Sequence, residues 1–516
     1  MTMLGAKAMG GVAAAAVSVG VAQLVAAAFG PQADVRNAVG SSVIELTPAP
    51  VKEWAIETFG TADKLVLGVL VLVVIAAVAA IAGMLEGPRR PIGSALIVAA
   101  GVAGCAAVLS REGATFIHIV PTVVGAACGV AVLRLLVSGR FSDTRDAPAV
   151  SDDAGAPDRG RRLSLVTLGF LGVGVASGVA GAVISRLTSS VSSDRQAFAL
   201  PRVDVAAAPV PAAVQPEGVA LPSFITDNAD FYRIDTALTV PQLSRADWQL
   251  RIHGMVDREV ILRFADLDRF EAVEKVVTLT CVSNPVGGDL ISTATWTGYR
   301  ISDILAEAGV QPDADMVLSM STDGWTAGTP VEALLSEDSL LAVGMNGEPL
   351  PVEHGYPARL VVPGLYGYVS ATKWLVDIEL TRFDRAEAYW TRLGWSARGP
   401  IKTESRIDVP RAGQDVAMGP VRLGGVAWAQ DRGVRDVEVQ IDTPSGQGDW
   451  QRAELGESYS DDTWRLWSFD WDAQETGFHK ITVRATDNDG YTQTSERVDP
   501  IPDGATGWHS ITFAVR

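Results

Sequence analysis

Cysteine is scarce in this chain, which limits the kinds of fold and metal site that it can build. Three cysteines occur in 516 residues, and Cys281 is the only one after Cys128. A disulfide-stapled fold is therefore excluded. The sequence has neither a Cys-x-x-Cys nor a His-x-x-x-His pair, so a metal site built entirely from protein ligands around Cys281 is not expected. Cys105 and Cys128 lie in apolar runs and are predicted to be small core residues.

Basic residues are in the minority. Lys and Arg number 42 against 60 Asp and Glu, which gives a net charge of −18 and a pI of about 4.8. A nucleic-acid surface needs clustered Lys and Arg rather than a dominant acidic field. The composition therefore indicates that nucleic acid is not a partner.

Long apolar runs are plentiful, by contrast, in the first 190 residues. Mean hydropathy is +0.21, which is high for a soluble protein. A membrane-spanning helix needs about 20 mostly apolar residues. The first candidate resembles a secretory signal, but its length and the four runs behind it favour an anchor. We predict a lipid-embedded anchor of about five helices over residues 1–187, with spans at 8–30, 64–85, 92–110, 114–137 and 163–187.

Arginines in the loops predict the orientation of this anchor. Arg89 and Arg90 lie between the second and third runs, and five further arginines lie between the fourth and fifth. The alternate loops contain few basic residues, diluted by acidic ones. Because short cytoplasmic loops are enriched in Lys and Arg, the N-terminus is expected in the cytoplasm. Everything after residue 190 is then expected outside the plasma membrane.

The outer part begins with a change of composition. Residues 188–222 are rich in Ser, Ala and Pro without a period, which predicts an extended linker holding the body off the bilayer. Residues 223–404 then show short β-rich runs and one amphipathic helix, at 298–310, that ends at Gly309. This pattern predicts an α+β domain. The apolar face of the helix is Ile301, Ile304, Leu305 and Ala308.

Helical patterns are absent after about residue 405. Alternating runs follow at regular spacing, separated by Gly- or Asp-rich turns. Residues 405–516 are therefore predicted to form an all-β immunoglobulin-like sandwich. Its core would have to hold without an inter-sheet disulfide, because this segment contains no cysteine.

Cys281 lies where a β-branched run meets a turn, and three roles are open for it. It could be a buried structural thiol. It could be a nucleophile, which would need a base, although nothing in the sequence places a histidine beside it. It could also be the thiolate ligand of a redox metal whose other ligands come from a cofactor. The candidate bases are His253, His354, His479 and His509.

Four segments around Cys281 occur in the order found in sulfite-oxidase-type molybdopterin oxidoreductases. They are "DNADFYRIDTALTVPQL", "TLTCVSN", "STDGWTAGTP" and "MNGEPLPVEHGYPARLVVPGLYGYVSATKW". Over residues 224–516 the chain resembles this family. The resemblance implies a molybdopterin-binding domain at 223–404, in which Cys281 ligates molybdenum and a pyranopterin dithiolene supplies two further sulfurs. In the family the final sandwich is a dimerisation domain, so a homodimer through 405–516 is an expected assembly.

The resemblance also implies which residues contact the cofactor. Arg359 and Lys373 are suited to neutralise the cofactor's phosphate, because binding that group needs a few cations. Asn284 takes the Asn position of the family's Cys-x-x-Asn loop. The full set implied for cofactor binding is Phe231, Tyr232, Arg233, Cys281, Asn284, Thr322, Asp323, His354, Arg359, Thr372 and Lys373.

The chain departs from the family around the expected substrate pocket. Arg233 matches the family's first arginine, but Asp235 stands where animal and plant enzymes have His. Tyr368 and Val369 replace an Ala-Arg pair, and Trp395, after Gly394, replaces a tyrosine. Loss of positive charge should lower affinity for sulfite. Added aromatic side chains, with Trp325 among them, suit a neutral or larger substrate.

The expected function is that of a membrane-anchored, molybdopterin-dependent oxidoreductase with an extracytoplasmic active site. It would transfer an oxygen atom to or from a small substrate, with S-oxide or N-oxide reduction favoured and sulfite oxidation as the alternative. The catalytic candidates are Cys281, Arg233 and Trp395, and electrons would pass to or from a separate protein or a quinone. A non-enzymatic surface or sensor protein that reuses the fold is a further alternative.

Overall fold

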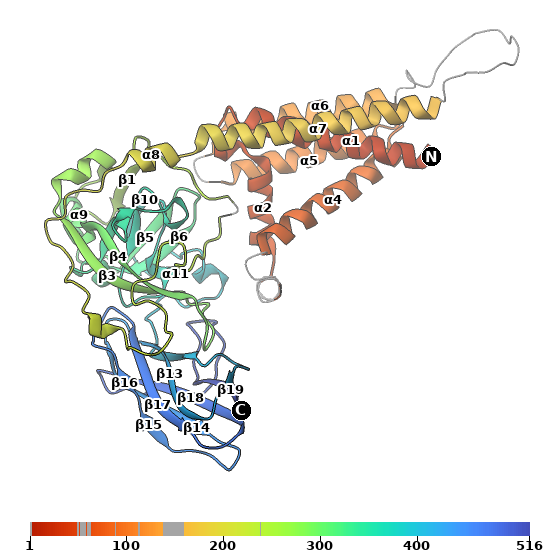
Figure 1. The fold of residues 1–516 in the computed structure, drawn as a ribbon. Coiled ribbons are helices and arrows are strands. Elements are labelled where there is room, and N and C mark those ends of the chain that lie inside the picture. The colour runs from red at the N-terminus through yellow and green to blue at the C-terminus, as the bar shows by residue number, and fades with distance from the viewer. Residues whose placement is uncertain are drawn as a thin grey trace, which may run out of the picture. The chain divides into compact units, whose positions relative to one another are not determined.

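The computed structural model describes residues 3–48, 51, 58, 63–87, 89–111, 114–137, 159–237 and 239–516. The chain divides into two compact units (Figure 1). One unit comprises Met1–Ser190 with Ala237–Thr239 and is called the membrane unit after the anchor predicted there. The other comprises Val191–Thr236 with Val240–Arg516 and is called the outer unit after its predicted location.

Five helices in the described part of the membrane unit are long and apolar enough to cross a bilayer. Their spans are Leu4–Ala26, Gly68–Leu85, Ile92–Leu109, Phe116–Val137 and Ser164–Ser185. The five predicted apolar helices are thus confirmed, while crossing and orientation stay predictions. The helices are α1 (Met3–Ala26), α4 (Asp63–Leu85), α5 (Ile92–Leu109), α6 (Val120–Val137, preceded by η3, Phe116–Ile119) and α7 (Arg159–Ser189), with the shorter η1 (Pro31–Ala33) and α2 (Val35–Leu46).

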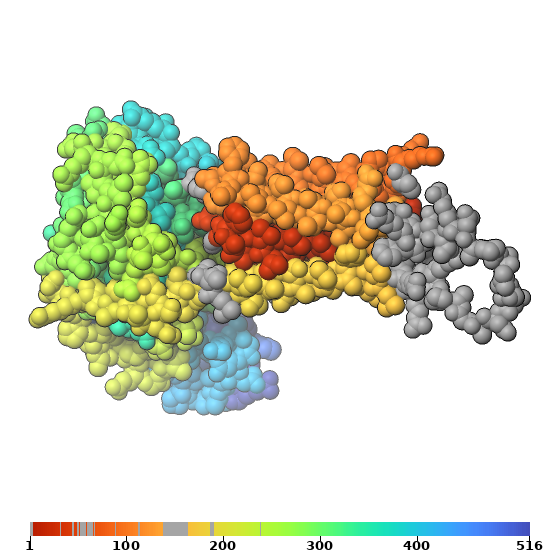
Figure 2. Space-filling view, turned by 90° about the horizontal axis from the view of Figure 1, so that it is seen from above, coloured from red at the N-terminus to blue at the C-terminus, as the bar shows by residue number. Residues whose placement is uncertain are grey.

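Helix α1 is the centre of this unit. It packs against α4, α6 and α7, and Figure 2 shows it in red between yellow α7 and the orange helices. Small residues permit the close approach: a Cβ added at Gly20 would lie 1.9 Å from the carbonyl oxygen of Gly174 on α7. An ion pair between half-exposed Arg134 and buried Glu86, with Arg134 Nε 3.0 Å from Glu86 Oε1, joins α6 to the residue after α4.

Two sheets form the first part of the outer unit. The first sheet has the order β2-β1-β10-β5-β6, with β1 parallel to β10 and the other pairs antiparallel. The second has the order β3-β4-β7-β8, and β9 also pairs with β7. Their strands are β1 (Gln249–Gly254), β2 (Val260–Arg263), β3 (Ala272–Thr280), β4 (Ile291–Arg300), β5 (Met316–Ser321), β6 (Thr326–Pro330), β7 (Leu340–Met345), β8 (Glu348–Pro349), β9 (Arg359–Val361) and β10 (Leu375–Thr381).

Short helices connect and cover these strands. Helix α9 (Ile301–Ala308) buries the four apolar residues predicted for its face and ends at Gly309, whose φ of 72° is left-handed. The predicted helix is therefore confirmed. The others are α8 (Ser192–Ala197), α10 (Val331–Leu334) and α11 (Gly367–Ser370), with the 3-10 turns η4 (Ala212–Val214), η5 (Phe264–Arg269), η6 (Val352–His354) and η7 (Thr391–Leu393).

The C-terminal part is all β. One sheet has the order β11-β13-β17-β16 and the other β12-β19-β18-β14-β15. They share a core in which Leu423 and Trp467 of the first meet Ile481 and Phe513 of the second. The β-rich prediction is confirmed, whereas its immunoglobulin-like topology stays a prediction. The strands are β11 (Glu404–Val409), β12 (Asp415–Val416), β13 (Gly419–Trp428), β14 (Val434–Asp442), β15 (Trp450–Arg452), β16 (Glu454–Leu455), β17 (Arg465–Ala473), β18 (Gly477–Asp487) and β19 (His509–Val515).

The predicted linker makes hydrogen bonds to the rest of the outer unit. Asp194 accepts hydrogen bonds from Arg245 Nη2 at 2.8 Å and from Tyr356 Oη at 2.7 Å. Farther along, the Asp204 N–H donates to the Ala272 carbonyl at 2.8 Å. Hydrogen bonds thus attach residues 191–222 to the outer unit at several points along the segment, and its role as a linker stays a prediction.

Candidate functional site

Cys281 follows the last residue of β3. Its N–H donates to the Leu290 carbonyl at 3.0 Å, and its carbonyl accepts from the Asn284 N–H at 3.1 Å. Only 9% of the residue is exposed. Burial raises the pKa of the Cys281 thiol, against the opposing effect of hydrogen bonds from Ser283. The backbone thus fixes the thiol at a strand end, where burial favours its protonated form.

Asn284 closes the loop that begins at Cys281. Its Oδ1 accepts from the Leu290 N–H at 2.9 Å, whereas its buried Nδ2 has no hydrogen-bond partner among the described residues. A buried amide donor without an acceptor is costly. This side chain therefore has one donor free for a ligand.

Arg359, the first residue of β9, is the most deeply buried cation of the site, at 4% exposure. It donates to the carbonyls of Leu360, His354 and Ala371 at 3.2, 3.1 and 3.5 Å. Its Cζ lies 5.0 Å from the centre of the Trp296 ring. Burial lowers the pKa of Arg359 to about 10. In the described part of the chain no carboxylate pairs with it, so its charge is available to an anionic ligand.

Lys373, two residues before β10, shares a carboxylate with Arg233. Lys373 Nζ lies 2.8 Å and Arg233 Nε 2.9 Å from the same atom, Asp235 Oδ2. Burial lowers the pKa of Lys373 to about 8, although Asp235 opposes this. Two cations therefore share one carboxylate, and Arg359 lies near enough to act electrostatically on Lys373. The cluster retains a positive excess.

His354 lies among these cations at the end of η6. Burial, followed by Arg359 and Lys373, lowers the pKa of His354 to about 3, so the ring is neutral near pH 7. The Phe231 ring meets it edge-on at 5.5 Å and stacks on Tyr232 at 5.4 Å. Burial first, and then the nearby Cys281, raises the pKa of Tyr232. These two aromatic residues therefore connect the cation cluster to the cysteine.

The remaining predicted cofactor residues have structural contacts of their own. The Thr322 N–H donates to the Trp374 carbonyl at 3.0 Å, and Asp323 Oδ1 accepts from the Trp325 N–H at 3.3 Å. The Thr372 hydroxyl lies 2.7 Å from that of Ser319 in the core. Thr322 is thus bonded to the residue that follows Lys373. The side chains of Thr372 and Asp323 already make hydrogen bonds, with Ser319 and with the Trp325 N–H.

Trp395, predicted as catalytic, lies in an aromatic cluster. Its ring is 5.7 Å from that of Tyr368 and 6.0 Å from that of Trp390. The same hydrophobic cluster contains Val282, the neighbour of Cys281. An apolar aromatic wall therefore lies close to the cysteine loop, and Trp325 is not among the members of this cluster.

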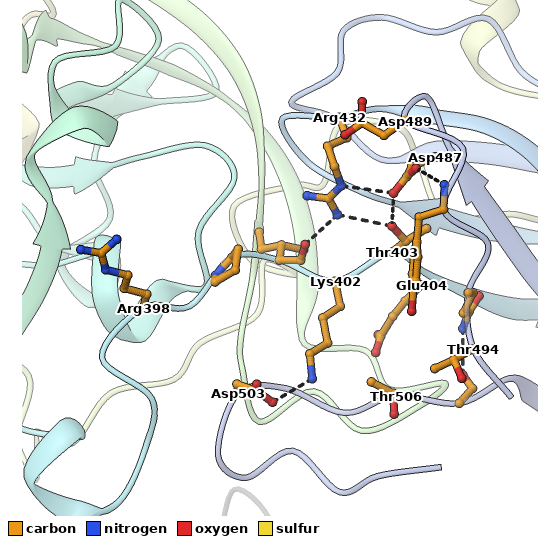
Figure 3. A pocket seen from close by; sticks show the side chains of 15 residues that line it. Arg398, Lys402, Thr403, Glu404, Arg432, Asp487, Asp489, Thr494, Asp503 and Thr506 are labelled. Atoms are coloured by element: carbon orange, nitrogen blue, oxygen red, sulfur yellow. Dashed lines mark hydrogen bonds and ion pairs between the residues drawn. The ribbon is translucent and has the colours of Figure 1, made fainter. Parts of the chain in front are cut away.

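A pocket of about 370 Å³ lies where residues 398–404 meet the C-terminal sheets. Figure 3 shows Lys402 directed at Asp503 and Arg432 directed at Asp487, with distances of 2.8 and 3.2 Å. Burial raises the pKa of Glu404, also in its lining, to about 8. The sequence did not predict this pocket, because its lining residues come from separate segments and no single motif contains them.

Comparison with known proteins assigns the class. Residues 237–390 match the family model described as an oxidoreductase molybdopterin binding domain. The uncharacterized oxidoreductase YuiH of Bacillus subtilis is 39% identical over 152 residues, covering 30% of this chain and 74% of YuiH. The chain is therefore a molybdopterin-dependent oxidoreductase.

More distant relatives specify the type. Mitochondrial sulfite oxidase of Homo sapiens is 30% identical over 343 residues, which cover 56% of this chain and 61% of that protein. The chain belongs to the sulfite-oxidase-type family of molybdopterin oxidoreductases. Among solved structures, the sulfane dehydrogenase SoxCD from Paracoccus pantotrophus matches with a TM-score of 0.47 and 25% identity, over 54% of this chain and 76% of that one.

The residues present fit molybdopterin. The cofactor carries a phosphate, and the site offers a buried arginine without a carboxylate partner. It also carries a pterin rich in acceptors, and the Asn284 Nδ2 donor is unsatisfied. No group of three or more His, Cys, Asp or Glu residues able to hold a metal occurs in the described ranges. A metal here would have to obtain most of its ligands from the cofactor.

Proposed function

We propose that this oxidoreductase is anchored in the plasma membrane with its active site outside the cytoplasm. Residues 1–187 form the anchor, residues 223–404 the cofactor domain, and residues 405–516 a sandwich of immunoglobulin type suited to a dimer contact. The segment 191–222, which is bonded to the outer body, joins them. The arginine-rich loops support this orientation.

Cys281 is the protein ligand of the molybdenum in this proposal. Support comes from its position at a strand end, three residues before Asn284, whose buried Nδ2 lacks a hydrogen-bond partner among the described residues. Cys281 and the Arg359 charge also both act electrostatically on Tyr232. Arg359 and Lys373 hold the phosphate, and neutral His354 and Phe231 border the pterin. Molybdopterin, when bound, supplies the redox metal at which a substrate gains or loses an oxygen atom. The protein residues bind and orient both partners.

Reduction of a small S-oxide or N-oxide is the reaction that the site favours. The observation that carries this choice is Asp235, whose side chain is 5% exposed and pairs with both Arg233 and Lys373. A site for a small dianion should keep its cations free, because a fixed carboxylate repels the ligand. Val369 is 1% exposed at the position where the family has an arginine. Tyr368 and Trp395 would instead receive a neutral substrate.

Sulfite oxidation is the second candidate, because Arg233 is retained and the human relative is named for it. The variant Asp235→Asn distinguishes sulfite oxidation from S-oxide reduction. It frees Arg233, so KM for sulfite should fall if sulfite is the substrate, whereas an S-oxide substrate would show little change in KM. A separate redox protein or a quinone would exchange electrons with the metal in either case.

Metal analysis of the full-length chain tests the proposal directly. Protein from cells supplied with molybdate should contain near-stoichiometric molybdenum, which Cys281→Ser should lose or bind with altered absorption. Cys128→Ser is the matched control, since it removes a thiol from α6 in the membrane unit, and it should keep its molybdenum. Folded wild-type protein without molybdenum, from cells whose other molybdenum enzymes are loaded, would contradict the enzyme assignment. Artificial electron donors and acceptors would then compare S-oxides, N-oxides and sulfite.

A further inference from the structure

The strand that leads to Cys281 is at the edge of its sheet. β3 pairs with β4 on one side only, so the polar backbone of its other side needs partners elsewhere. Near the cysteine those partners come from the C-terminal all-β part. The Thr278 N–H donates to the Asp462 carbonyl at 3.0 Å, and the Thr278 hydroxyl accepts from the Trp464 N–H at 2.8 Å.

Gln430 completes this set of contacts. Its Nε2 donates to the Thr278 carbonyl at 3.2 Å and to the Thr280 hydroxyl at 2.9 Å. Thr280 immediately precedes Cys281, and Gln430 is fully buried. The turn that carries Gln430 is itself fixed, because Arg432 pairs with Asp487 at 3.2 Å (Figure 3).

The other end of the cysteine loop is held by the same part of the chain. Arg406 Nη1 donates to the Gly288 carbonyl at 2.8 Å, and Arg406 Nε pairs with Asp408 at 3.0 Å. The His509 ring fills the space beside Gly287, where an added Cβ would lie 2.3 Å from His509 Cδ2. His509 is fixed in turn, since its Nδ1 accepts from the Ile407 N–H at 3.0 Å.

We propose that Gln430 and Arg406 are positioning residues that hold the two ends of the loop carrying Cys281, so that the C-terminal all-β part sets the direction of the thiol toward the cofactor. This rests on the proposed role of Cys281 as the metal ligand. Neither residue touches the cofactor site directly. Their effect is exerted through the backbone of residues 278–288.

Gln430→Met tests the inference, because it keeps the side-chain volume and removes both donated hydrogen bonds. The matched control is Gln440→Met. Gln440 lies on β14 in the same part of the chain, and its Nε2 donates to the Gly448 carbonyl at 2.8 Å rather than to β3 or the cysteine loop. Two readouts are used on the full-length protein. One is the rate of Cys281 alkylation by iodoacetamide in cofactor-free protein, followed by peptide mass spectrometry. The other is the electron paramagnetic resonance spectrum of the loaded protein after one-electron reduction.

Gln430→Met should alkylate at Cys281 about ten- to thirty-fold faster than wild type, the factor expected for two lost hydrogen bonds, and should shift the spectrum. Gln440→Met should change neither, even if its thermal midpoint falls as far. Equal behaviour of the two variants in both readouts overturns the inference. If Gln430→Met does not fold, Arg406→Lys, which keeps the charge beside Asp408, must produce the same pair of changes or the inference fails.

Failure of the proposed function has a different signature. Molybdenum would then be missing from wild-type protein, while the alkylation rates of the cofactor-free variants would still decide whether Gln430 and Arg406 hold the loop.

Discussion

Replacing Arg359 by Met separates a cofactor-binding role from a structural one. Burial lowers the pKa of Arg359 from its ordinary value to about 10, which corresponds to about 3 kcal/mol of unfavourable free energy for the charged form. Against this, the guanidinium donates to three carbonyls at 3.2, 3.1 and 3.5 Å. Because these distances are longer than those of strong charge-assisted hydrogen bonds, each bond is taken as about 1 kcal/mol net. The two contributions nearly cancel. Arg359→Met should therefore leave the unfolding free energy of cofactor-free protein within about 1 kcal/mol of wild type.

Cofactor binding should respond much more strongly. A hydrogen bond to a charged group contributes about 1.5–3 kcal/mol, so loss of the phosphate contact predicts about a 10- to 100-fold weaker retention of the cofactor. The assay measures thermal unfolding of cofactor-free protein and, separately, the pterin and molybdenum that remain after dialysis of loaded protein.

Arg465→Met is the matched control for this experiment. Arg465 is also partly buried and donates to the carbonyls of Gly456 and Val434 at 2.9 and 2.7 Å, but it lies in the C-terminal sheets. It should lower stability and leave cofactor retention unchanged. The reasoning would be refuted if Arg359→Met behaved in the same way, with several kcal/mol lost from cofactor-free protein and normal retention.

Three further predictions concern stability. The pKa of His354 is about 3 in the folded protein against 6.5 as its ordinary value, so the unfolded state binds more protons between these pH values and stability falls as pH falls through that window. His354→Gln should therefore reduce the pH dependence of the unfolding free energy by up to about 1.4 kcal/mol per pH unit. The check is the slope of the thermal midpoint against pH from 6.5 to 4.5, and equal slopes for variant and wild type would contradict the prediction. Asp194→Ala removes the acceptor of Arg245, so limited proteolysis should cut residues 191–222 faster, and an unaltered digestion pattern would argue against docking of this segment. Arg134→Leu removes the cation of buried Glu86, but the Arg134 side chain is itself 48% exposed and Ser94 still donates two hydrogen bonds to Glu86, so the loss should be about 1–2 kcal/mol. A thermal midpoint in detergent equal to that of wild type would show that the pair is unimportant.

The sequence by itself determined the features that depend on neighbouring residues. Apolar runs of spanning length identify the five helices, and the spacing of Ile301, Ile304 and Leu305 identifies α9, because helical periodicity and turn signals act over a few residues. The ordered motifs around Cys281 were also sufficient to identify the cofactor class, since that family is recognised by short segments.

Only the tertiary structure decided how these residues act together. The sequence does not distinguish Arg359 from any other arginine in a strand. In the structure it lies over the Trp296 ring, and no carboxylate among the described residues pairs with it. Asp235 became the shared partner of Arg233 and Lys373, which are separated by 140 positions along the chain yet lie within about 3 Å of one oxygen. No pattern along the sequence predicts that residues 191–222 dock on the outer unit, or that Gln430 donates hydrogen bonds to β3. Hydrogen bonds and charge between distant segments depend on how sheets and loops pack, and no local pattern in the sequence encodes that packing.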